Sequence, residues 1–151
     1  MRIYLPSTLP ALAAALAEGR FEPAPLSGYG VTPALRARLG DDEEELEYEA
    51  MRAAADASLR LLAADPAAPR RRVVIAAEVP ETAVDPATES GEPAALTVHG
   101  AVPLKRVASA HVDDEAAMTD VATAVTEDDP ARADEHELLW YATQEFRYLV
   151  E

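Results

Sequence analysis

The sequence predicts an α/β fold of the α+β type, a two- or three-layer sandwich in which four helices cover a mixed sheet of about five short strands. Val73 to Ala77 are five consecutive apolar residues without alternation, which indicates a strand covered on both faces. Leu46 to Ala64 has the periodicity of a long helix with a narrow polar side. Strand-like segments also lead directly into helix caps, so the expected order is β-α-β-α-β-β-β-α-α.

The N-terminal residues predict a strand followed directly by a helix. Arg2 to Leu5 forms the expected strand, and Pro6 is expected to end it. Ser7 or Thr8 can then cap a helix, and Gly19 is expected to terminate that helix.

The same strand-to-helix turn is expected a second time after a connecting loop. Pro23, Pro25 and Gly28 mark the loop, Tyr29 to Thr32 predicts a second short strand, and Pro33 to Leu39 predicts a helical turn.

The middle of the chain combines the long helix with two charge clusters. The acidic run Asp41 to Glu45 stands where a helix N-terminus favours negative charge, and it is interpreted as a solvated first turn. Arg70, Arg71 and Arg72 precede the buried strand and are a weak candidate for anion recognition. The more common fate of such arginines is pairing with carboxylates, and no glycine-rich phosphate cradle accompanies them.

The second half predicts short elements between two acidic loops. Residues 80–94 and 126–134 have the composition of mobile loops. The elements expected around them are a strand from Leu96 to Val102 interrupted by Gly100, a helical turn from Pro103 to Val107, a strand from Ala108 to Val112, and a helix from Glu115 to Val125.

The last segment, Asp134 to Val150, has apolar residues that fall within one arc of a helix. We therefore predict a two-sided C-terminal helix whose apolar side packs on the core. Its other side would either meet the protein's own loops or form a contact face. The residues proposed for that contact face are Glu137, Trp140, Tyr141, Gln144, Arg147 and Tyr148.

The composition limits the functions that are expected. The 151 residues fit a single globular domain, 1–151. The formal charge of −15 repels nucleic acid and anionic membranes. There is no cysteine, the opening residues lack a long apolar run, and no stretch is long enough to span a membrane, so a cytoplasmic location is expected.

Catalytic motifs are missing from the sequence, so an enzyme is not favoured. No nucleophile elbow, phosphate-binding loop or zinc motif is present, and no cofactor or metal site is expected. The leading hypothesis is a protein-interaction or regulatory module that binds a protein partner or associates with itself. The alternative is a small-molecule-binding protein or enzyme, with a crevice formed by Tyr4, His111, Asp113, His136, Glu137 and Tyr141. Asp113 or Asp114 can also be read as a simple helix cap.

Four blocks of sequence support a family resemblance. They are M-R-I-Y-L-P-S-T-L-P-A-L, Y-G-V-T-P-A-L-R, A-S-L-R-L-L-A-A-D-P-A-A-P-R-R-R-V-V-I-A-A-E-V-P and H-E-L-L-W-Y-A-T-Q-E. Together they resemble a family of small uncharacterised actinobacterial proteins, classed as a domain of unknown function. The resemblance spans nearly the whole chain except the acidic loops. It implies a cytoplasmic bacterial protein, and it carries no activity, cofactor or catalytic residue onto this sequence.

Overall fold

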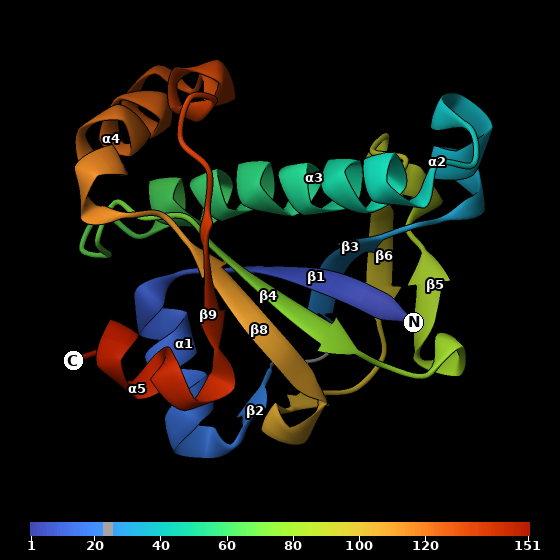
Figure 1. Ribbon diagram of the computed structural model, residues 1–151, viewed down its shortest axis with the longest axis horizontal. Coiled ribbons are helices and arrows are strands. Elements are labelled where there is room, and N and C mark those ends of the chain that lie inside the picture. Colours follow the sequence, from blue (N-terminus) through green and yellow to red (C-terminus); the bar gives the residue numbers. More distant parts are fainter. Residues whose placement is uncertain (23–25) are drawn as a thin grey trace.

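A seven-stranded sheet in the order β5-β6-β3-β1-β4-β8-β9 forms the middle layer of the computed structural model, which describes residues 1–22 and 26–151 (Figure 1). Its strands are β1 (Arg2–Ser7), β3 (Leu26–Gly30), β4 (Val73–Glu78), β5 (Val84–Pro86), β6 (Ala95–Val98), β8 (Val107–Val112) and β9 (Leu139–Ala142). A second, two-stranded sheet pairs β2 (Arg20–Phe21) with β7 (Val102–Pro103).

Helices cover both faces of the large sheet. The long α3 (Glu43–Ala64) lies on one face with α2 (Pro33–Leu39) before it, while α1 (Leu9–Glu18) and α5 (Phe146–Leu149) lie on the other (Figure 1). The helix α4 (Met118–Glu127) packs near the C-terminal end of α3. The sandwich of mixed α and β structure predicted from the sequence is therefore confirmed.

Alternate residues of β4 fill two separate cores. Val73, Ile75 and Ala77 belong to the core on the α1 side, and Val74 and Ala76 belong to the core beneath α3. Because successive side chains of a strand point to opposite faces, an unbroken apolar run is what such a strand requires. The prediction of a strand buried on both faces is confirmed.

The helix caps also follow the predicted pattern. The Thr8 side chain accepts a hydrogen bond from the Ala11 amide at 3.2 Å, and Gly19 ends α1 with a φ of 81°. The Asp42 carboxylate caps α3 by accepting from the Glu44 and Glu45 amides. The acidic run is therefore largely the first turn of α3, as expected.

Several local predictions are corrected by the structure. Every strand pairing among the described residues is antiparallel, so the sheet is not mixed. The helix α1 leads into the small β2–β7 sheet rather than crossing to a parallel neighbour. Pro6 lies inside β1, beyond the Ile3 and Tyr4 positions at which β3 pairs, so the amide hydrogen that it lacks has no partner there.

Two predicted loops also contain strand residues. Gly28 lies within β3, where an added Cβ would stand 3.3 Å from the Val98 side chain, so it allows two strands to approach closely. The 80–94 segment contains β5, and Pro130–Ala133 in the second acidic segment forms a short 3-10 helix. The predicted loop positions Pro23 and Pro25 lie outside the described residues.

The predicted C-terminal helix from Asp134 to Val150 is wrong. Leu139–Ala142 forms strand β9, and only Phe146–Leu149 is α-helical. The helical periodicity is real, but β8 presents backbone groups that a neighbouring strand can satisfy, and Trp140 and Tyr141 both favour strands. Pairing with the sheet therefore overrides the local helical pattern.

Candidate functional site

The strand β9 is one edge of the large sheet. It pairs with β8 through the register His111↔Trp140 and Ala110↔Tyr141, and within residues 1–22 and 26–151 it has no neighbour on its other side. Its sequence, Leu-Trp-Tyr-Ala, contains no charge and no proline. An exposed apolar edge of this kind is a ready template for pairing with another chain.

The backbone of β9 presents hydrogen-bonding groups outward at Trp140. The Ala142 amide donates to the Glu145 carboxylate at 2.9 Å, so this amide does not belong to the ladder with β8. Backbone groups of a strand alternate in direction with a period of two. The amide and carbonyl of Trp140 therefore also point away from β8, and Glu145 closes the edge only at its C-terminal end.

The opposite edge of the sheet is protected. The strand β5 has only three residues and ends in Pro86, and its Asp85 carboxylate lies 2.5 Å from the His99 ring. Short length, proline and charge are the usual devices that prevent an edge from pairing. The contrast between the two edges distinguishes β9 as the one that is open to a further strand.

The Trp140 side chain lies on the α3 side of the sheet. Residues that pair across antiparallel strands point to the same face, and the pairs Trp140↔His111 and His111↔Val74 link Trp140 to the face on which Val74 packs beneath α3. Trp140 is nevertheless 62% exposed, so the α3 layer does not cover its side chain. Tyr141 points to the other face and packs against the core on the α1 side.

A groove runs between α3 and the extended segment that leads into β9. It encloses about 500 Å³. Tyr48 and Met51 of α3 and Leu138 supply apolar surface, and Tyr48 is 62% exposed. The remaining lining residues are Arg52, Ala55, Arg72, Asp134, His136 and Glu137.

A buried ion pair fixes the floor of this groove. The Arg72 guanidinium donates to both carboxylate oxygens of Asp113, at 2.8 and 2.9 Å, and both side chains are almost fully buried. The same guanidinium donates to the carbonyls of Ala133 and His136, which anchors the segment before β9. Arg72 and Asp113 are therefore structural, which contradicts the anion prediction for Arg72 and a cap role for Asp113. Asp114 does stand at the N-cap position of the 3-10 helix Glu115–Ala117, but its side chain makes no cap hydrogen bond.

The exposed charge beside the groove is predominantly acidic. Arg52 is shared between Glu49 at 3.2 Å and Asp56 at 3.5 Å, and His136 lies 2.7 Å from Asp120. Burial raises the pKa of the Asp56 carboxyl, and the nearby Asp134 charge adds to that rise, although Arg52 opposes it. When Glu49, Asp56, Asp113 and Asp120 are counted with the lining residues, carboxylates outnumber arginines around the groove, which favours a positively charged occupant.

Two titratable groups on the α3 face are shifted by burial. Burial raises the pKa of the Tyr4 phenol well above its ordinary range, and its hydrogen bond to Glu47 at 2.6 Å raises the pKa further. Burial lowers the pKa of His111, and the charge of Arg2 lowers it more. Both groups are neutral near pH 7 and add no charge to this face.

The predicted contact residues do not share one surface. Trp140 lies on the α3 face, Tyr141 on the opposite face, and Glu137 in the segment before β9. Gln144, Arg147 and Tyr148 follow the strand and are exposed, with the Arg147 guanidinium 4.9 Å from the centre of the Tyr148 ring. The helical contact face therefore does not exist, and Trp140 is exposed because it stands on an edge strand.

The alternative crevice is not assembled either. Tyr4 is bonded to Glu47, Asp113 is committed to Arg72, and Tyr141 points to the other face of the sheet. His111 lies near Ser109, whereas His136 lies near Asp120. No group of three or more potential metal ligands comes together among residues 1–22 and 26–151.

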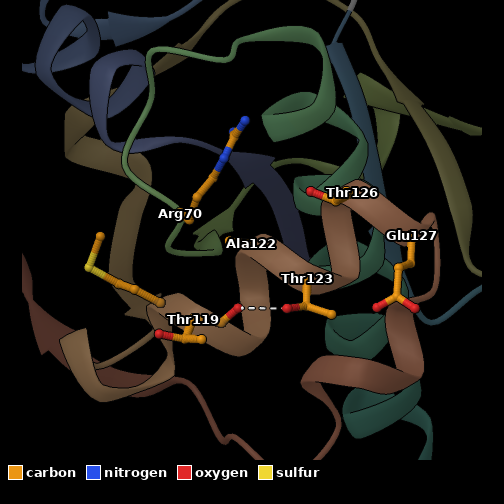
Figure 2. Close-up of a pocket in the computed structure, with 7 residues that line it drawn as sticks. Arg70, Thr119, Ala122, Thr123, Thr126 and Glu127 are labelled. Carbon is orange, nitrogen blue, oxygen red and sulfur yellow. Dashed lines mark hydrogen bonds between the residues drawn. The ribbon is translucent and has the colours of Figure 1, made fainter.

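The three consecutive arginines also separate. Arg70 donates to the carbonyls of Leu62 and Asp65 at the end of α3, and Arg71 donates to the Asp113 carbonyl. Arg70 borders a pocket of about 560 Å³ beside α4, but its side chain extends away from the α4 threonines (Figure 2). The structure therefore gathers no anion site from these residues.

Sequence reasoning missed the residues that define the site. Tyr48 and Met51 lie on or beside the predicted long helix, where nothing in the sequence marks a contact surface, and no sequence pattern marks Glu145 as the residue that closes the end of an edge strand. The strand-forming preference of Leu-Trp-Tyr was a signal that pointed to β9. The groove has no local sequence signal, because its lining residues lie up to 90 positions apart, from Tyr48 to Leu138.

The geometry defines an α+β protein whose antiparallel sheet has one open apolar edge beside an acidic groove. The chain matches Family of unknown function (DUF6912) over residues 1–150, and it belongs to that family. No curated protein and no solved structure gives a significant match. No helix within the described part of the chain is both long and apolar enough to cross a membrane.

Proposed function

We propose that this protein binds another polypeptide by strand addition at β9. The bound segment would become an eighth strand of the sheet and would accept and donate main-chain hydrogen bonds at Trp140. The observation that carries this proposal is the difference between the two edges, since β5 is protected by Asp85 and Pro86 and β9 is open.

The side chains around β9 suit this mode of binding. Trp140 offers a large exposed ring on one face, and Leu139, which is 43% exposed, offers apolar surface on the other. A paired strand alternates its side chains between the same two faces. Main-chain bonds would supply affinity, while the groove beside Leu138 and the surface near Leu139 would select side chains.

The proposal can be tested with a displayed library of random nonapeptides. We expect wild-type protein to enrich peptides that slow exchange of the Trp140 amide hydrogen, as measured by nuclear magnetic resonance. The Tyr141 amide, which faces β8, is expected to be slow with or without peptide. Trp140→Pro removes the outward amide and is expected to abolish binding.

Trp140→Ala distinguishes the contribution of the indole ring to binding from that of the backbone amide. It retains the amide, so binding is expected to weaken without disappearing. Failure to enrich any peptide, or peptides that bind wild type and Trp140→Pro equally, would overturn strand addition.

We also propose that this binding takes place in the cytoplasm. The fold uses no cysteine and needs no oxidising compartment for disulfide formation. Fractionation of cells producing a tagged protein checks this, and recovery outside the cytoplasmic fraction would contradict it.

A further inference from the structure

Building on the proposed strand addition, we infer that the partner is a basic extended segment with lysine or arginine at alternate positions and apolar residues between them. Three features of the molecule support such a partner: the charges that flank the edge, the two different faces of β9, and the charge of the whole chain.

Carboxylates stand at both ends of the β9 edge. Asp134, Glu135 and Glu137 precede the strand and are exposed, and Glu145 follows it. The basic groups beside the groove are largely engaged, because Arg52 is shared by two carboxylates and Arg72 is buried against Asp113. A segment paired along β9 would therefore pass between acidic groups.

The two faces of β9 differ in what they offer a partner. On the α3 face the partner's side chains would lie near Trp140 and the acidic groove, where a cation gains from the carboxylates and from the indole ring. On the opposite face they would meet Leu139 and Tyr141, which are apolar. Because side chains alternate between the two faces of a strand, a partner that suits both faces has basic residues directed to the α3 face and apolar residues directed to the opposite face.

The charge of the whole chain favours the same partner and disfavours a second copy. With 28 acidic and 13 basic residues, the formal charge is −15. Pairing two β9 strands of identical chains would bring two such charges and two sets of flanking carboxylates together. Like-charge juxtaposition opposes association, whereas a basic segment is attracted from a distance.

Three synthetic octapeptides test the inference, each with valine at every second position and lysine, glutamate or glutamine between. Binding is followed by Trp140 fluorescence and by exchange of the Trp140 amide. We expect the lysine peptide to bind about tenfold more tightly than the glutamine peptide, as several exposed ion pairs acting together would allow. The glutamate peptide should bind most weakly.

Charge variants identify where the preference arises. The double variant Asp134→Asn/Glu137→Gln is expected to weaken binding of the lysine peptide by about threefold to tenfold, while binding of the glutamine peptide changes little. The matched control Glu81→Gln/Glu89→Gln removes the same charge near the protected β5 edge and should leave binding nearly unchanged. Raising the salt from about 50 mM to about 500 mM should reduce the preference for lysine.

The outcomes separate the two proposals. Equal binding of the lysine and glutamate peptides, with the Trp140 amide protected by both, would overturn the basic partner and leave strand addition intact. Self-association of the wild-type protein that is lost in Trp140→Pro would likewise overturn the basic partner and leave strand addition intact. Lysine-peptide binding that survives Trp140→Pro, or that gives no Trp140 amide protection, would overturn both.

Discussion

At the scale of single residues, buried polar groups in this protein are used for construction. Ser58 shows this, because its hydroxyl donates to the Ser7 carbonyl at 2.7 Å and accepts from the Val73 amide at 3.0 Å. It therefore ties α3 to the ends of β1 and β4. Arg72 and Asp113 similarly join the start of β4 to the residue that follows β8, its neighbour on the side away from β1. These roles could not be read from the sequence, since the partners are far apart along the chain.

Breaking the buried Arg72–Asp113 pair should be strongly destabilising. Arg72→Met leaves the Asp113 carboxylate buried with only its backbone partner, and we expect a loss of about 3–5 kcal/mol in the free energy of unfolding. The exposed pair Arg20–Glu22 provides the control, and Arg20→Met should change the free energy of unfolding far less than Arg72→Met, because water screens the exposed pair. Urea denaturation measures the free energy of unfolding of both variants. Equal losses would show that the buried pair contributes no more to stability than the exposed pair.

His111 should make stability depend on pH in the mildly acidic range. Burial lowers its pKa in the folded protein, so below its ordinary value of 6.5 the unfolded chain binds the proton more readily. The contribution of His111 to the free energy of unfolding should therefore fall as pH falls through 6.5. His111→Gln removes this contribution, and its stability should decline less than that of wild type between about pH 6.5 and 5.5. Parallel curves from urea denaturation would contradict the assignment.

At the scale of elements, β9 determines where the C-terminal residues lie relative to the sheet and its two cores. As a strand it completes the hydrogen bonding of β8, delivers Tyr141 to one core and exposes Trp140 on the other face. It also carries the chain to α5, where Phe146 is buried in the α1-side core. The apolar residues that suggested a helix therefore reach the core through a strand and a short helix in succession.

A pair of proline substitutions tests the orientation of β9. The Trp140 amide faces outward, so Trp140→Pro should cost no more than about 1 kcal/mol of folding free energy. The Tyr141 amide faces β8, so Tyr141→Pro removes a ladder bond and disturbs the edge, with an expected cost of about 2–3 kcal/mol. Thermal or urea unfolding measures both variants. The reverse order would show that β9 presents the other set of amides to solvent.

At the scale of the whole molecule, the asymmetry of the sheet matters most. One edge is capped by a short strand with proline and an Asp85–His99 contact, and the other presents four uncharged residues beside a groove. The formal charge of −15 opposes the close approach of identical chains, most strongly at low salt. In the proposed mode of binding, this combination would leave an apolar edge open to a basic segment while disfavouring pairing between copies.

The sequence alone determined the elements whose signals are local. These include the capped helices α1, α2 and α3, the helix α4, the buried strand β4, the break at Gly100 between β6 and β7, and the acidic net charge. Capping, burial periodicity and net charge depend on residues near one another or on simple totals, so they can be read without coordinates.

Only the tertiary structure decided the strand order, the antiparallel pairing and the fate of residues 134–150. A segment with both helical periodicity and strand-forming residues takes the form that satisfies its neighbours, and here the free edge of β8 selected the strand. The groove arose in the same way, since α3 and the approach to β9 meet only after the sheet has formed. The candidate site is therefore a product of long-range contacts, which local sequence patterns do not encode.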